Sequence, residues 1–203
     1  MLDHVLLDVI GAIRRGFGAA LLERQAVEER FQADVFLGDL SWETSYSLPG
    51  EESPPRVRAD LSLDWPTWSQ SAYRSWSIGE PPEDLPELVV EVALRIQRLA
   101  GAPDASVILS ALPDQSPPLG SESLRRSRPT VEQTLGDGET PASFAVEVSY
   151  EGTWQLDEGV LENPSSAEAQ LAGLGGWVAS TLVRLSDLGF EFLPPGDEEA
   201  NLR

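Results

Sequence analysis

The feature that most constrains the fold is a strict alternation of apolar and polar residues over two neighbouring stretches. The apolar positions of these two stretches are Leu40, Trp42, Thr44, Tyr46 and Leu48, and then Val57, Ala59, Leu61, Leu63 and Trp65. Successive side chains of a β-strand point to opposite faces, so this period of two predicts two half-buried strands. The intervening segment 49–55 contains three prolines and two glutamates, and we expect it to be an exposed loop that closes a β-hairpin. A shorter alternation at 31–37 begins the first strand or forms a strand of its own.

Three other stretches place apolar residues three and four positions apart, which is the period of an amphipathic helix. The first extends from residue 2 to about 28. The second covers 85–99, where Asp84 stands at the N-cap position and Pro86 lies in the first turn. The third covers 165–188, where a serine and a glutamate have the spacing of a capping box.

The remaining segments predict further strands. Short strands are expected near 72–78 and over 104–112, and 123–135, which contains the one local cluster of arginines, is expected to form a strand at a sheet edge. A second hairpin is expected over 144–156. Its turn is placed at Glu151-Gly152, because glycine is common in tight turns.

Taken together, these elements predict the order helix, strands, helix, strands, helix. The expected fold class is α+β, with antiparallel sheet or sheets and three main helices, because single strands and helices do not alternate regularly. We treat 1–193 as one domain, with a pseudo-duplication into 1–101 and 102–193 as an alternative, and 194–203 as a loosely held acidic tail led by proline. This element order loosely resembles that of the type III secretion chaperones, which implies dimerisation through a helix or a strand.

The chain is strongly acidic: 34 acidic side chains against 14 basic ones give a formal net charge of −20. Phosphates repel such a chain, so we expect no direct binding of nucleic acid or of a membrane, and we expect a basic protein partner. A homodimer is compatible with the sequence. No signal peptide and no apolar run of the roughly 20 residues that a membrane span needs are present, so we expect a cytoplasmic protein. The exclusive use of arginine as the basic residue is typical of bacteria with GC-rich genomes.

Composition also excludes several site chemistries. The absence of cysteine excludes thiolate zinc sites, iron–sulfur clusters and cysteine nucleophiles, and the absence of lysine excludes P-loop and Schiff-base lysines. His4 is the only histidine and is expected to be an exposed helix residue. Carboxylates are abundant, but Asp60 and Asp64 on one strand would lie about 13 Å apart, too far for a glycosidase pair. A cross-strand pair of Asp60 and Glu43 stays open, and we expect no catalytic residue, no metal and no cofactor.

The six tryptophans are the most informative side chains. Trp42, Trp154 and Trp177 fall on apolar stripes and are assigned to the core. A second group surrounds a proline at a strand end and is expected to form a partner-binding platform rimmed by acidic side chains, since aromatic anchors with charged rims are common at protein interfaces. The expected partner-binding residues are Trp65, Trp68, Tyr73, Trp76, Asp60 and Asp64. Half-buried packing beneath a helix explains the aromatic residues equally well.

The sequence therefore favours a non-catalytic, acidic protein-interaction module that binds a basic or aggregation-prone partner, as an immunity protein, a secretion chaperone or an accessory subunit would. The alternative is a carbohydrate-binding or glycoside-acting protein, in which Trp65, Trp68 and Trp76 stack on sugar rings. In that case Asp60, Asp64 or Glu147 would bind hydroxyl groups or act as acid and base. Mimicry of nucleic acid by spaced carboxylates is a third hypothesis.

Overall fold

A computed structural model describes most of the chain. It covers residues 39–51, 53–80, 82–136, 141–161 and 165–195, together with Gly11 and Arg15, and the backbone alone of 27–36, 162 and 164. Most of the helix expected over 2–28, including His4, and most of the expected acidic tail lie outside the described residues.

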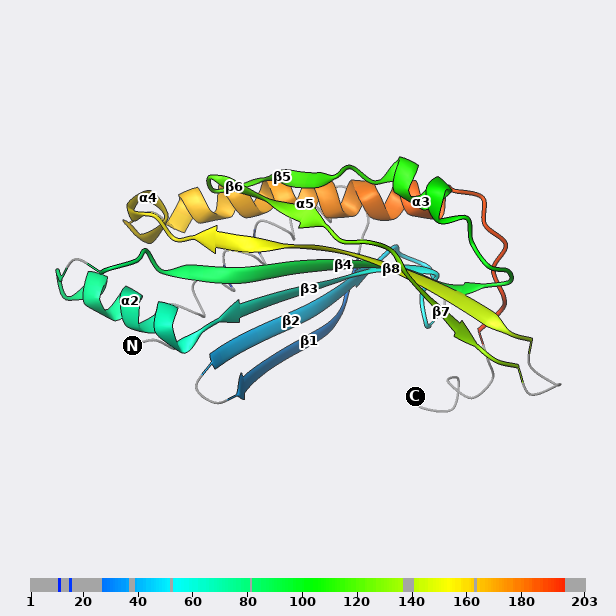
Figure 1. Ribbon diagram of the computed structural model, residues 1–203, viewed down its shortest axis with the longest axis horizontal. Coiled ribbons are helices and arrows are strands. Elements are labelled where there is room, and N and C mark those ends of the chain that lie inside the picture. The colour runs from blue at the N-terminus through cyan, green and yellow to red at the C-terminus, as the bar shows by residue number, and fades with distance from the viewer. Residues whose placement is uncertain are drawn as a thin grey trace.

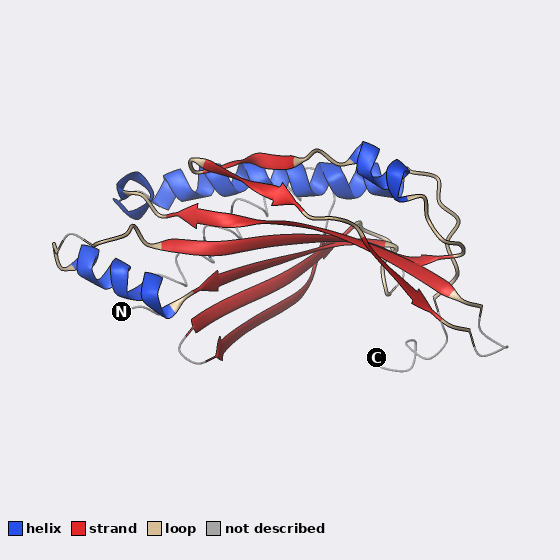
Figure 2. Ribbon diagram, viewed as in Figure 1, coloured by secondary structure: helices blue, strands red, loops and turns tan. Residues whose placement is uncertain are grey.

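The described residues form eight strands and four helices (Figures 1 and 2). The strands are β1 (Val27–Phe36), β2 (Asp39–Ser47), β3 (Val57–Trp65), β4 (Glu87–Leu99), β5 (Gln115–Leu119), β6 (Glu122–Arg126), β7 (Thr130–Thr134) and β8 (Ser143–Gln155). The helices are α2 (Thr67–Ser77), α3 (Ala105–Ala111), α4 (Glu158–Glu162) and α5 (Pro164–Ser186). All strands belong to one sheet in the order β1-β2-β3-β4-β8-β6-β5, with β7 also paired to β8, and every pairing is antiparallel.

The predicted fold class is wrong in its order of elements. The described chain begins with three strands, not with a helix, and α2, β4, α3 and four more strands precede the final pair of helices. The combination of an antiparallel sheet with helices, roughly an α+β fold, is the part of the prediction that holds. The likeness to type III secretion chaperones was based on the predicted order, so it loses its support.

The largest error concerns 85–99, which is the strand β4 and not a helix. Its buried residues follow a period of two, and they are Leu88, Val90, Val92, Leu94 and Ile96. The segment fits the period of a helix as well as that of a strand, because most of its residues are apolar. Valine and isoleucine lose χ1 freedom in a helix and pack well on a pleated surface, and pairing with β3 and β8 on both sides stabilises the strand.

The errors at 72–78 and 104–112 run in the opposite direction, because both segments belong to helices. α2 buries Ser69 and Gln70, which are polar, and the alternation over 72–78 conceals the helical spacing of Trp68, Ala72 and Trp76. Gly79, with φ of 80°, ends this helix in the left-handed conformation that glycine adopts readily. α3 is capped by Asp104, whose side chain accepts a hydrogen bond from the backbone N–H of Ser106.

The second hairpin does not form, because β8 continues without a turn from Ser143 to Gln155. Gly152 pairs with Val90 inside the ladder. A Cβ atom at this position would lie 3.1 Å from the side chain of Leu124 on β6, so glycine here permits the close approach of a neighbouring strand. The segment 123–135 contains two strands, β6 and β7, in place of one.

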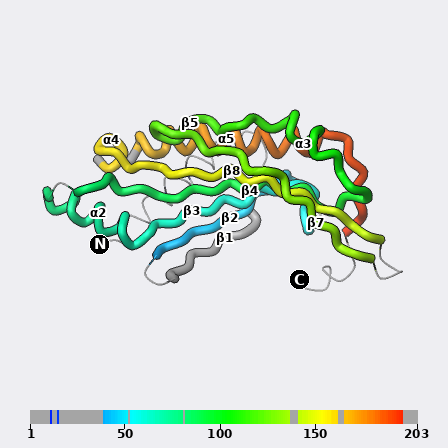
Figure 3. Tube along the Cα trace, viewed as in Figure 1, coloured from blue at the N-terminus to red at the C-terminus, as the bar shows by residue number. Residues whose placement is uncertain are grey.

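The predicted hairpin of β2 and β3 and the last helix are confirmed. The loop between the two strands is exposed only in part, because Pro55 is buried and the side chain of Glu51 is 4% exposed. α5 packs on one face of the sheet and contacts strands as far apart as β3 and β5. The tryptophans Trp42 and Trp154 are fully buried in this core, and Trp177 is partly buried against it. Figure 3 shows the Cα trace of α2 at one end of the strands, away from α5. Among the described helices, none packs on the opposite face of the sheet, and most side chains of β2 and β3 on that face are polar.

Candidate functional site

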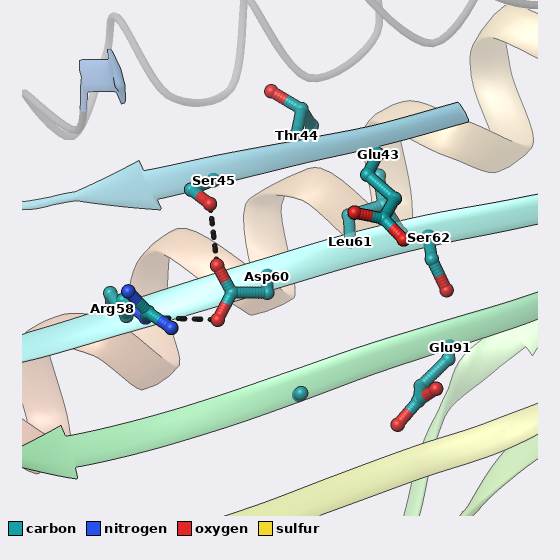
Figure 4. A pocket seen from close by; sticks show the side chains of 9 residues that line it. Glu43, Thr44, Ser45, Arg58, Asp60, Leu61, Ser62 and Glu91 are labelled. Atoms are coloured by element: carbon teal, nitrogen blue, oxygen red, sulfur yellow. Dashed lines mark hydrogen bonds and ion pairs between the residues drawn. The ribbon is translucent and has the colours of Figure 1, made fainter. Parts of the chain in front are cut away.

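The sheet face opposite α5 is lined by polar side chains. They are the alternate residues of β2, β3 and β4, and Figure 4 shows several of them in front of the sheet with a helix behind it. A hollow of about 290 Å³ lies on this face between Glu43, Asp60 and Glu91. In an antiparallel sheet with one covered face, such side chains are what solvent or a partner meets.

The two ends of this face differ in how their charges are paired. At the end away from α2, Arg58 Nε lies 2.9 Å from Asp60 Oδ2, and Ser45 Oγ donates a hydrogen bond of 2.5 Å to Asp60 Oδ1 (Figure 4). Arg95 at the same end pairs with Glu132 at 2.5 Å and with Glu147 at 3.2 Å. Each of these carboxylates therefore has an arginine partner.

Several acidic side chains lie at the end near α2, and we call four of them the acidic patch: Asp39, Glu43, Asp64 and Glu91. Within the described part of the chain, none of the four forms an ion pair. The strand register places Asp64 opposite Ser41 on β2 and Val89 on β4, so Asp39 and Glu91 are its diagonal neighbours. Diagonal neighbours lie roughly 7 to 8 Å apart between Cα atoms.

The pKa of Asp64 reflects this crowding. Partial burial raises it above the ordinary value of 3.8, and the negative charges of Glu91 and Asp39 raise it further. Asp39 shows the opposite shift, because the side chain and the backbone N–H of Thr67 donate hydrogen bonds of 2.7 and 2.6 Å to its carboxylate and lower its pKa. Within the part of the chain that the structure describes, no arginine pairs with the negative charge of this patch.

The aromatic residues of α2 lie beside this patch. Trp68 is 49% exposed at the first turn. Tyr73 contacts Trp76 at a ring-centroid distance of 5.8 Å and packs edge-on against Trp65 at 5.7 Å. We call Trp68, Tyr73 and Trp76 the aromatic ridge.

Trp65 is 0% exposed and belongs to the core. Its indole N–H donates to Ser69 Oγ at 3.1 Å, and the same hydroxyl bonds the backbone of Glu87. This buried network fixes α2 to the end of β3 and β4. Trp65 therefore supports the aromatic ridge from below and offers no surface of its own to a partner.

The structure brings together only some of the predicted site residues. Trp68 follows Thr67, which binds Asp39, so the aromatic ridge and the acidic patch meet at the start of α2. Asp64 belongs to this junction. Asp60 lies in the other direction along β3, roughly 17 Å from the strand's end by the rise per residue, and its carboxylate is occupied by Arg58 and Ser45.

Sequence reasoning missed Asp39 and Glu91. Glu91 was assigned to a helix, so its place across from β3 could not be anticipated. Asp39 lies directly before Leu40, where the alternation of β2 begins, and it falls on the polar side of that alternation, with Ser41 and Glu43. That continuation is the signal that places Asp39 on the same face as Asp64.

The open question of a cross-strand pair between Asp60 and Glu43 has a geometric answer. Glu43 faces Ser62 and Asp60 faces Ser45, so the two acids are diagonal neighbours.

Among the described residues, no group of three or more histidine, aspartate or glutamate side chains is arranged to hold a metal ion. The same part of the chain contains no helix that is both long and apolar enough to cross a membrane.

Comparisons with protein-family models, with curated proteins and with solved structures find no match to this chain.

Proposed function

We propose that the chain is a non-catalytic protein-interaction module whose acidic patch and aromatic ridge bind a basic protein partner. One observation carries this proposal: Asp39, Asp64 and Glu91 lie together with no ion pair among the described residues, and Asp39 binds Thr67, the residue before the exposed Trp68. An immunity protein, a dedicated chaperone or an accessory subunit of a bacterial cytoplasm would act in this way.

The physical argument is one of compensation. Clustered carboxylates repel one another, and partial burial of Asp64 adds a desolvation cost. A partner's arginine or lysine would relieve the repulsion and offset the desolvation cost through ion pairing, while Trp68 supplies an apolar anchor at the edge of the charged surface. The net charge of −20 would also accelerate the encounter with a basic partner and repel nucleic acid and anionic lipid.

Affinity capture with a pair of matched variants tests this proposal. The patch variant carries Asp64→Asn and Glu91→Gln. The control variant carries Glu122→Gln and Glu191→Gln, two exposed acids that form no ion pair among the described residues and lie outside the patch. Both variants lose the same two negative charges, so a difference between them reports the patch and not the overall field.

We expect the wild type and the control to retain the same basic protein from a bacterial lysate, and the patch variant to lose it. Retention should also fall above about 0.5 M salt, where screening shortens the reach of charge–charge interactions to a few ångströms. Equal retention by the two variants, or capture of acidic proteins alone, would contradict the proposal.

The carbohydrate hypothesis is less well supported. Sugar stacking on tryptophan and acid–base work by Asp60 require both groups at one site, yet the exposed tryptophans are on α2 and Asp60 is well along β3. Both oxygens of Asp60 already accept contacts from Ser45 and Arg58. If the wild type were retained on a polysaccharide column and the variant Trp68→Ala were not, the carbohydrate hypothesis would be favoured over the protein-binding one.

A further inference from the structure

The sheet leaves a strand edge open at β7. Among the described elements, β1, β5 and β7 each pair with a single strand. β5 contains Pro117 and Pro118, which cannot donate to a further strand, so this edge is protected against strand addition. β7 has no proline.

All five residues of β7 are exposed, so none of the described segments covers this strand. Val131 is 49% exposed, and Leu135, one residue past the strand, is 80% exposed. Edge strands of natural proteins are usually shortened, charged or covered, because their free N–H and C=O groups recruit further strands. β7 combines free backbone groups with exposed apolar side chains on one side.

We propose that β7 accepts an extended segment of the basic partner as an added strand of the sheet. This inference rests on the proposed function, because the charge of the expected segment comes from that partner. Glu132 pairs with Arg95 and so lies on the polar face of the sheet, whereas Val131 has the opposite phase. Glu132 is paired with Arg95, but its side chain is 55% exposed, so its carboxylate can accept a second cation. The segment that fits has arginine or lysine toward Glu132 and apolar side chains toward Val131.

A second copy of this chain fits the edge less well. In an antiparallel pair of two β7 strands centred on Glu132, the two Glu132 side chains face each other, and like charges directly opposite are destabilising. Each copy also carries a net charge of −20, which opposes close approach. The net negative charge of the chain therefore favours a basic strand over a homodimer.

Peptide probes that differ only in their backbone test the proposal. The probe is a short, end-blocked peptide of alternating arginine and valine, used with the full-length protein. Two further versions carry N-methyl groups on the arginine amides or on the valine amides. An added strand uses the amides of alternate residues for pairing, so one methylated version should bind at least about tenfold more weakly and the other should bind almost normally. The amides of β7 should gain protection from hydrogen exchange with the unmodified peptide.

The variant Val131→Ser, compared with Val183→Ser on α5, tests the apolar contact. Both valines are exposed, and only the first should weaken binding, by about threefold or more. Equal binding of the two methylated peptides, with protection near Asp64 alone, would overturn strand addition and leave the proposed function intact. Protection of β7 that grows with protein concentration in the absence of peptide would also overturn it, in favour of a second copy. Failure of the unmodified peptide to bind at any site would instead contradict the proposed function.

Discussion

Replacing Asp64 with asparagine should make the protein more stable and weaken its binding to a basic partner. Asp64 is partly buried on β3 and is the diagonal neighbour of Glu91. Asparagine is nearly isosteric with aspartate and carries no charge. The variant therefore removes the repulsion and most of the desolvation cost while it keeps the packing.

The size of the effect follows from the register. Two unit charges about 7.5 Å apart repel by about 0.5 kcal/mol in a water-like medium and by about 2 kcal/mol at an effective dielectric constant of 20. Physiological salt, with a screening length of about 8 Å, reduces these values by about half. The range is then about 0.3 to 1 kcal/mol, and because Asp64 is only partly buried, we expect a gain near its lower end, about 0.3 to 0.5 kcal/mol at neutral pH.

The gain should depend on pH in a defined direction. The folded chain raises the pKa of Asp64 above 3.8, so the folded state binds more protons than the unfolded state just above that pH. The stability of the wild type relative to the variant therefore falls as the pH rises from 3.8 through the raised pKa, and then stays constant. Below pH 3.8 the two proteins should have similar stability, because the carboxyl is protonated in both states.

Denaturant unfolding at several pH values, with Glu122→Gln as the control for general charge reduction, measures this difference. Equal gains in both variants would show that overall charge and not the patch is responsible. A loss of stability in Asp64→Asn at neutral pH would refute the reasoning, because it would mean that the carboxylate has a stabilising partner. Weaker retention of the basic partner by this more stable variant would indicate that the charge is kept for function.

Three further predictions concern the fold. Ser69→Ala should lower the free energy of unfolding by about 2 to 4 kcal/mol in denaturant titrations, because the N–H groups of Trp65 and Glu87 lose their buried acceptor; a loss below about 1 kcal/mol would contradict this network. Gly120→Ala should lower the free energy of unfolding by about 1 to 2 kcal/mol in the same assay, because Gly120 has φ of 69° in the β5–β6 turn. An unchanged midpoint of the denaturant titration would argue against that turn. Tyr150 has its pKa raised from 10.0 to about 12, chiefly by burial, so a spectroscopic titration should show one late tyrosine that is missing in Tyr150→Phe. Because the folded state keeps this proton longer, the stability of the wild type should decline between pH 10 and 12 more steeply than that of the variant, and equal slopes would contradict it.

The sequence predicts correctly those elements in which the apolar residues follow only one period, that of a helix or that of a strand. The β2–β3 hairpin alternates cleanly because one face is buried and the other is polar, and α5 has a continuous apolar stripe. Residues 85–99 satisfy the periods of both helix and strand, so only the neighbouring strands decide between them. α2 is hidden for the opposite reason, since its buried positions Ser69 and Gln70 are polar and are satisfied by tertiary hydrogen bonds.

The candidate site could be predicted in part for the same reason. The polar phase of β3 identified Asp64 as surface charge, and the cluster of aromatic residues after Pro66 identified Trp68 and its neighbours. The alternation of β3 assigns Trp65 to the buried phase, which separates it from the aromatic ridge. Glu91 joins Asp64 only through the β3–β4 register, a long-range property that local sequence does not carry.

Carboxylate footprinting of the wild type, with and without its captured basic partner, tests the central claim most directly. Carbodiimide labelling followed by mass spectrometry reports the accessibility of each acidic side chain. We predict that the partner protects Asp64 and Glu91 and leaves Glu122 and Glu191 reactive. Unchanged labelling of Asp64 and Glu91, together with protection of the other two, would place the partner elsewhere and contradict the assignment of the acidic patch.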